Sequence, residues 1–227
     1  MADGRTKRWV PHRAEVRSQL IESAMHAIDV LGPQVSMREI ADQAKIPKAR
    51  LYRFFTDKPE LASAISDRIQ EMVAERIASG PTEEGATLGR FLRSGITRYL
   101  ELANDHPNIF RFMILTISEA GESADLRLER KSEPARDIAS VLRAVIVAHG
   151  GTDNDVELVA YMLVGSIINA GNWWLMRGRA SNATLAGTVD KVDSNVRALV
   201  QSAANANNVH IDFDAPIAEY FSAAASS

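Results

Sequence analysis

The residues best suited to chemistry in this sequence are a group of hydrogen-bond donors between positions 48 and 58. Ammonium and phenol groups donate hydrogen bonds to phosphate oxygens, and a guanidinium donates two parallel bonds to the edge of guanine. On a helix from Lys48 to about Phe55, Leu51 and Phe55 face inward, which leaves the donors mostly outward. The pattern indicates a surface that binds nucleic acid. The donors are Lys48, Arg50, Tyr52, Arg53 and Lys58.

Two short helices joined by a tight turn are expected to position this surface. Ser36-Met37-Arg38-Glu39 has the pattern of a capping box, and the helix that it opens ends near Lys45. Pro47 suits the first turn of the next helix, where its missing N–H costs little. Such a helix-turn-helix places its second helix in the major groove, while the first braces against the DNA backbone.

Residues 36–58, SMREIADQAKIPKARLYRFFTDK, resemble the TetR family of transcriptional regulators. The family motif is a short helix with an acidic residue, a turn, K-x-x-L-Y-x-x-F and a following Lys. The resemblance extends back through the amphipathic helix that ends at Leu31-Gly32 and covers about residues 13–73. The matching positions are Ile40, Ala41, Ala44, Lys48, Leu51, Tyr52, Phe55 and Lys58.

The resemblance also implies roles for individual residues. Tyr52 and Lys58 would contact phosphates, and Lys48, Ala49 and Arg50 would approach base edges. Arg50 is the best candidate for a bidentate contact with guanine. The full expected DNA-binding set is Ser36, Pro47, Lys48, Ala49, Arg50, Tyr52, Arg53 and Lys58.

Two residues depart from the family pattern around the turn. Lys45 stands where the family often has Gly, so a positive φ there would be strained. Pro47 stands where the family often has Ser, so the second helix is expected to lack a side-chain cap.

The charge of the chain is unevenly distributed. The net charge is −3, but residues 1–58 carry eleven Lys and Arg against seven acids, and residues 59–227 carry 15 against 22. A head of +4 and a body of −7 favour one module that faces nucleic acid and a second with another task. The basic residues before position 18 form either a soluble tail or an N-terminal arm on the DNA. They are Arg5, Lys7, Arg8, Arg13 and Arg17.

The rest of the chain reads as helix, with no strand alternation. We therefore predict an all-α protein with a three-helix DNA-binding domain at 1–58 and a larger helical domain at 59–227 for effector binding and dimerisation. Helices are expected over 16–31, 60–77, 87–103, 108–119, 132–148, 153–176 and 185–204. The Ala/Asn/Ser-rich tail from Asn205 is expected to be loose, with one docked turn at Ile217, Tyr220 and Phe221 as the exception.

The resemblance implies that the last two long helices form a four-helix interface in a homodimer. Val156–Met176 approaches the length of a membrane span, but Glu157 and two Asn interrupt it, which favours a buried helix. Because this helix is apolar on two faces, it needs its own core and a partner outside it. The predicted interface residues are Gly165, Leu185, Val189, Val192, Val196 and Leu199.

A ligand pocket in the acidic domain is likewise implied by the resemblance. Apolar walls with a few polar anchors suit a small lipophilic or amphipathic molecule. The alternative for each residue is ordinary core packing. The predicted walls are Phe91, Tyr99, Phe110, Met113, Ile117, Val141, Met162, Ser166, Asn169 and Trp173.

Catalysis finds no support in the sequence. The absence of Cys excludes disulfides, thiolate sites and thiol redox chemistry. The five His have no metal-ligand spacing, and the common phosphate-binding and hydrolase motifs are missing. No cofactor or metal is expected.

These observations favour a cytoplasmic, dimeric repressor that binds a double-stranded operator and is released by a small molecule. The N-terminus has no apolar run after its basic residues, so no signal peptide is expected. The alternatives are a dimeric DNA-binding regulator without an effector, and a small-molecule-binding module without DNA function.

Overall fold

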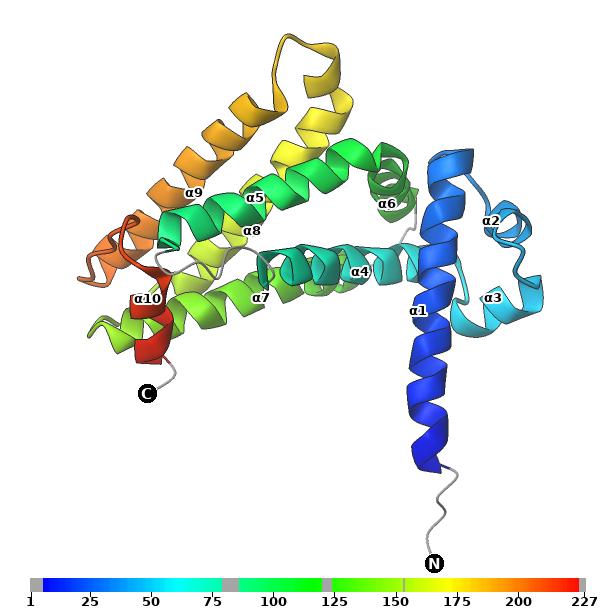
Figure 1. The fold of residues 1–227 in the computed structure, drawn as a ribbon, viewed down its shortest axis with the longest axis horizontal. Helices are drawn as coiled ribbons and strands as arrows, with labels where there is room; N and C mark the ends of the chain where they lie inside the picture. The colour runs from blue at the N-terminus through cyan, green and yellow to red at the C-terminus, as the bar shows by residue number, and fades with distance from the viewer. Residues whose placement is uncertain (1–5, 79–85, 120–123, 153, 225–227) are drawn as a thin grey trace, which may run out of the picture. The chain divides into compact units, whose positions relative to one another are not determined.

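The computed structural model describes residues 6–78, 86–119, 124–152 and 154–224, and it is helical throughout (Figure 1). In these ranges the one extended pairing is an isolated bridge between Thr87 and Pro216. The predicted all-α class is therefore confirmed. The helices are α1 (Thr6–Leu31), α2 (Met37–Gln43), α3 (Lys48–Phe54), α4 (Lys58–Ala78), α5 (Leu88–Asp105), α6 (Pro107–Glu119), α7 (Ala124–Ala148), α8 (Val156–Met176), the short 3-10 helix η1 (Gly178–Ala180), α9 (Leu185–Ala206) and α10 (Ile217–Ala224).

The chain divides into two compact units. Unit 1 runs to Met72 and also includes His106–Gly121, so it contains α1, α2, α3, most of α4, and α6. Unit 2 comprises Val73–Asp105 and the chain from Glu122 onward. The predicted boundary after residue 58 coincides with the start of α4, whereas the compact unit continues to Met72 and takes in α6.

The core of unit 1 is built on one face of α1. Leu20 and Ala24 are buried, as their spacing predicts, and Ile28 is buried beside them, whereas Leu31 at the end of the predicted stripe is exposed. Helix α1 contacts both α2 and α6. Two polar contacts join the end of α1 to the start of α6. The Nδ1 of His106 lies 2.6 Å from a carboxylate oxygen of Asp29, and the side-chain amide of Asn108 donates to the Asp29 carbonyl at 2.8 Å.

The core of unit 2 lies among α5, α7, α8 and α9, which pack against one another. Its fully buried side chains include Leu100, Ile146 and Val156. At one point α5 and α8 approach closely, since a Cβ on Gly171 would lie 2.9 Å from the ring of Tyr99. Burial there raises the pKa of Tyr99, so its phenol stays neutral.

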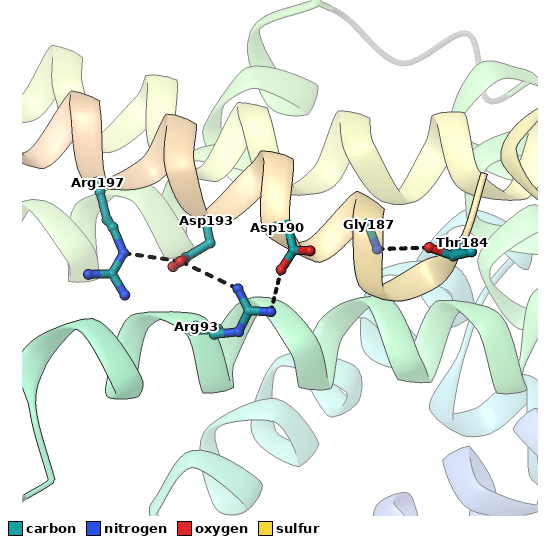
Figure 2. Close-up of polar contacts among 6 residues, drawn as sticks. All are labelled: Arg93, Thr184, Gly187, Asp190, Asp193 and Arg197. Carbon is teal, nitrogen blue, oxygen red and sulfur yellow. Dashed lines mark hydrogen bonds and ion pairs between the residues drawn. The ribbon is translucent and has the colours of Figure 1, made fainter.

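A network of charged side chains joins α5 to α9 (Figure 2). Arg93 on α5 reaches both Asp190 and Asp193 on α9, and Arg197 donates from Nε to Asp193 at 3.0 Å. Figure 2 shows Asp193 between the two guanidinium groups. The Asp193 side chain is 10% exposed, whereas that of Asp190 is 60% exposed. Because charge is costly to bury unless it is paired, Asp193 depends on these two partners more than Asp190 does.

The C-terminal tail is docked. The turn around Tyr220 docks, as the sequence analysis allowed, but the prediction that the rest of the tail is loose was wrong. Tyr220 is buried, and its hydroxyl accepts from the amide of Asp212 and donates to the Asp212 carbonyl. The first amides of α5 have no partner within their own helix. The tail supplies the missing acceptors, because Leu88 donates to the Ala215 carbonyl and Gly89 to that of Phe213.

Candidate nucleic-acid interface

The N-terminus of α2 is fixed by a complete capping box, as predicted. The hydroxyl of Ser36 accepts from the Glu39 amide, and the Glu39 carboxylate accepts from the Ser36 amide at 2.9 Å and from its hydroxyl at 2.6 Å. These two hydrogen bonds lower the pKa of the Glu39 carboxyl, and the positive charge of Lys58 adds to the effect. Both donors of Ser36, which was expected to contact DNA, are thus directed to Glu39.

The turn between α2 and α3 has the strained conformation that the sequence predicts. Lys45 adopts φ 56°, in the left-handed region. The next helix begins at Lys48 with Pro47 as its N-cap, and no side chain caps it. The two departures from the family pattern therefore both have structural consequences.

The recognition face of α3 is exposed while its opposite face is buried. Leu51 and Phe55 are fully buried, which confirms their inward assignment. On the outer face, Tyr52 is 47% exposed, and Ala49, Arg50 and Arg53 are exposed as well. Lys48 is half-buried at the start of the helix. The arrangement presents two guanidinium groups, an ammonium group and a phenol to solvent along one short helix.

Lys58 is the first residue of α4, beside the start of α2. The amide of Glu60 donates to Asp57, which caps α4, and Thr56 donates to the Glu60 carboxylate from its amide and hydroxyl. The Nζ of Lys58 lies 5.0 Å from the ring centre of Phe112 on α6, within the range of a cation–π contact. Lys58 is therefore held at a helix N-terminus, a position that favours anions.

The basic residues before position 18 belong to a helix wherever they are described. Lys7, Arg8 and Arg13 lie within α1, whereas Arg5 lies outside the described residues. The guanidinium of Arg13 lies 5.8 Å from the ring of Phe54, and that of Arg17 lies 5.4 Å from the ring of Phe55. The sequence did not predict these contacts, which attach α1 to the C-terminal end of α3.

The predicted pocket residues are divided between the two units. Phe110 and Met113 are buried in unit 1 on α6, which also carries Ile117. The remaining seven lie in unit 2, where three of the apolar ones are on the surface of the subunit. These three are Val141, Met162 and Trp173, with exposed fractions of 44–47%.

The other predicted wall residues of unit 2 are placed as follows. Phe91 and Tyr99 are half-buried on α5. Ser166 donates to the Met162 carbonyl and Asn169 to the Gly165 carbonyl, so each satisfies a donor within α8. An open groove of about 580 Å³ beside α7 and α8, lined by residues that include Arg143, Leu158 and Tyr161, contains none of the predicted walls.

The predicted interface residues on α9 mostly face inward. Val189, Val192 and Val196 are buried in the core of unit 2, and Leu185 and Leu199 are half-buried against it. Their burial places them in the core of the subunit itself rather than on a surface open to a second one. Gly165 on α8 differs, because nothing lies within 4 Å of the position that its Cβ would occupy.

Helix α8 exposes an apolar stripe that was not among the predicted interface residues. By length and composition α8 could span a membrane, but it packs on α7 and α9 and exposes its other side. This agrees with the expectation that α8 needs a core and an outside partner. The signal for the stripe was a spacing of three or four residues within each end of α8, with Met162 and Trp173 eleven residues, or about three turns, apart. The exposed apolar side chains, which we call the α8 stripe, are Leu158, Tyr161, Met162, Trp173 and Met176.

Comparison with known proteins agrees with this geometry. The family model for bacterial regulatory proteins of the tetR family matches residues 20–65, which contain α2 and α3. An uncharacterized HTH-type transcriptional regulator of Mycobacterium tuberculosis is 31% identical over 186 residues, which make up 81% of this chain and 77% of the relative.

Solved structures share the fold at low sequence identity. A tetR-family transcriptional regulator from Streptomyces coelicolor has a TM-score of 0.58 at 22% identity, over 94% of this chain and 88% of that one. The fatty acid degradation regulator FadR from Bacillus halodurans has a TM-score of 0.60 at 16% identity, over 81% of this chain and 97% of that one. These likenesses extend the agreement from the helix-turn-helix to most of the chain.

Proposed function

Since this chain belongs to the TetR family of DNA-binding transcriptional regulators, we propose that it is a cytoplasmic repressor. It binds operator DNA as a homodimer and is released by a small lipophilic or amphipathic molecule. The observation that carries the proposal is the exposed face of α3, with Arg50, Tyr52 and Arg53 directed to solvent on a helix anchored by Leu51. A binding module without DNA function does not account for this face.

The α3 face divides into base and phosphate contacts. Lys48, Ala49 and Arg50 belong to the N-terminal half of α3, which reaches base edges when such a helix enters the major groove. Tyr52 and Lys58 contact phosphates, which fix the orientation of the protein without reading sequence. Lys58 supports this division. Its residue begins α4, and its charge acts on Glu39 in the first turn of α2.

Homodimerisation through the α8 stripe supplies the second recognition helix. One seven-residue helix makes few contacts, whereas two related by a two-fold axis read half-sites about 34–36 Å apart. Met176 is 74% exposed and Leu158 60%, and large apolar surfaces of this kind commonly mark interfaces. The open position beside Gly165 permits two α8 helices to approach closely.

The effector acts by binding the two arrangements of the DNA-binding heads with different affinity, because only a differential affinity shifts an equilibrium. The chain passes from unit 1 to unit 2 within α4, so this helix can transmit the change. One structural relative is a regulator of fatty acid degradation. Fatty acids are therefore the first compounds to test.

A second candidate is a dimeric regulator that requires no effector. It is favoured by the exposure of Val141, Met162 and Trp173 and by the close packing of Tyr99 on Gly171. Both features reduce the space for a pocket within unit 2 of a single subunit. The two candidates share the DNA-binding surface and differ only in the response to small molecules.

The test begins with DNA from the organism that encodes the protein. Fragments retained by the purified protein are sequenced, and the bound sites are placed upstream of a reporter gene. We expect enriched sites with two-fold symmetry, lower reporter output when the protein is present, and release of the DNA by at least one lipophilic compound. Increased reporter output would contradict the repressor role. Retention of the DNA throughout a broad compound library would favour the second candidate.

A further inference from the structure

Among the residues that the structure describes, four helices end on a residue in the left-handed conformation, and one of the four is a lysine. The φ angle is 96° at Gly32, 56° at Lys45, 81° at Gly150 and 56° at Asn208. Glycine has no Cβ to clash in this conformation, and asparagine tolerates it better than most residues do. Three of the four ends therefore use the expected residue types, and only the end of α2 does not.

The end of α2 is a complete Schellman motif, which defines the position of Lys45. The amide of Ile46 donates to the Ala41 carbonyl at 2.9 Å, and that of Lys45 donates to the Asp42 carbonyl at 3.2 Å. The same pair of bonds recurs at the end of α9, where Val209 donates to Ala204 and Asn208 to Asn205. Lys45 thus occupies the site at which Gly is most common.

Local structure does not explain the lysine. Its side chain is exposed, and it forms no ion pair within the part of the chain that the structure describes. The backbone bonds of the motif require no side chain. Because a glycine would satisfy the fold with less strain, a role for the ammonium group outside this subunit accounts better for Lys45.

The position of Lys45 indicates what that role is. The turn precedes Lys48 by three residues and leads directly into the N-terminal end of α3 (Figure 1). This is the end of a recognition helix that faces base edges, so the preceding turn lies beside the phosphates that border the groove. We propose that Lys45 contacts a DNA phosphate and that the strained turn holds its ammonium group there. The proposal rests on the DNA-binding function described above.

The experiment compares stability with the salt dependence of DNA binding. Lys45→Gly relieves the strain and removes the charge, Lys45→Gln removes only the charge, and Lys45→Arg keeps it. Asn208→Gly is the matched control, because it changes the same position of the same motif in unit 2. Thermal unfolding gives Tm. Binding to a mixed-sequence duplex is measured over a range of salt concentrations, because phosphate contacts are independent of sequence.

We expect Lys45→Gly to raise Tm by about 2 °C while weakening DNA binding. For both Lys45→Gly and Lys45→Gln, the slope of log affinity against log salt becomes shallower by about 0.9 per bound protomer. Lys45→Arg keeps the wild-type slope, and Asn208→Gly leaves DNA binding unchanged. A Lys45→Gln protein with the wild-type slope and affinity would overturn the proposal.

The wild-type protein and Lys58→Gln, at a proposed phosphate contact, separate this result from a failure of the DNA-binding function itself. If the wild-type protein binds the duplex with no salt dependence, the proposed function is at fault, and Lys45 then contacts no phosphate either. If the wild-type slope is steep and Lys58→Gln makes it shallower while Lys45→Gln does not, only the role of Lys45 is wrong.

Discussion

Arg50 carries the sharpest prediction for a single side chain. It is exposed on α3, two residues from the start of the helix, where a guanidinium can bond O6 and N7 of guanine. Arg50→Ala is expected to weaken binding to the selected operator by about 1–3 kcal/mol while changing binding to a mixed-sequence duplex much less. Titrations of both DNAs at one salt concentration measure the difference. Equal losses on the two would contradict a base contact.

Lys58→Ala provides the contrasting case for Arg50. A phosphate contact carries no sequence information, so this substitution is expected to weaken binding to both DNAs to a similar extent. Lys58 also lies against the Phe112 ring, and part of any loss could come from that contact. A matched measurement of Tm separates the two causes, since in the absence of DNA only the contacts of Lys58 within the protein, with Phe112 and with the charge of Glu39, contribute.

Side-chain partners limit what the sequence reveals about individual residues. The motif predicted the outward direction of Arg50 and Tyr52, because the buried positions of one short helix determine it. It did not predict that Arg13 and Arg17 pack on Phe54 and Phe55, since contacts between separate helices depend on their packing. Arg13 was expected to lie in either a soluble tail or an arm on the DNA, and its observed contact adds the aromatic ring of Phe54 as a partner.

The ion-pair network between α5 and α9 leads to a prediction about the free energy of unfolding. Asp193 accepts from Arg197 and lies 3.6 Å from Arg93, and its side chain is largely buried (Figure 2). Removing a buried partner leaves charges unpaired, so we expect Asp193→Ala to lower the free energy of unfolding by about 2 kcal/mol. Asp190→Ala is the control, because Asp190 is exposed and such pairs contribute about 0–1 kcal/mol. Urea unfolding that gives equal losses would contradict the distinction.

The docked tail leads to a second prediction, on the stability that Tyr220 contributes. Tyr220→Phe removes a hydroxyl that donates to the Asp212 carbonyl and accepts from its amide. A loss of about 1 kcal/mol is expected, which corresponds to a fall in Tm of about 2–4 °C. Tyr52→Phe is the matched control, because that phenol is exposed on α3 and the measurement contains no DNA. An unchanged Tm for Tyr220→Phe would show that the tail does not stabilise unit 2.

The elements that the sequence predicted best are those with a local signal. The capping box at Ser36, Pro47 at the start of α3 and the apolar spacing of α1 all act within a few residues. One docked turn around Tyr220 was allowed for, but the pairing of the tail with α5 was missed because its signal is the unpaired amides of Leu88 and Gly89, far away in the sequence. The inward direction of Val189 was not predicted either, since a stripe on a helix does not reveal which partner covers it.

In the whole molecule, the positive charge lies on the part that carries the DNA-binding helices and the negative charge on the rest of the chain. The head of +4 contains α2 and α3, and the body of −7 has no need to approach phosphates. Association with DNA is therefore expected to weaken steeply with salt. The absence of Cys has a related consequence, because a signal sensed by this chain cannot act through thiol chemistry.

Dimerisation gives the prediction that involves the whole assembly. Met162 lies within the α8 stripe and is 47% exposed. Because the interface is two-fold, dimerisation would bury one such carboxylate from each subunit, and burying unpaired charge is costly. We therefore expect Met162→Glu to yield a folded monomer. Loss of simultaneous contact with two half-sites should then weaken operator binding by about 100-fold or more. Val30→Glu, at an exposed valine of α1, is the control. Analytical ultracentrifugation that finds Met162→Glu still dimeric, with operator affinity intact, would mean that another surface joins the subunits.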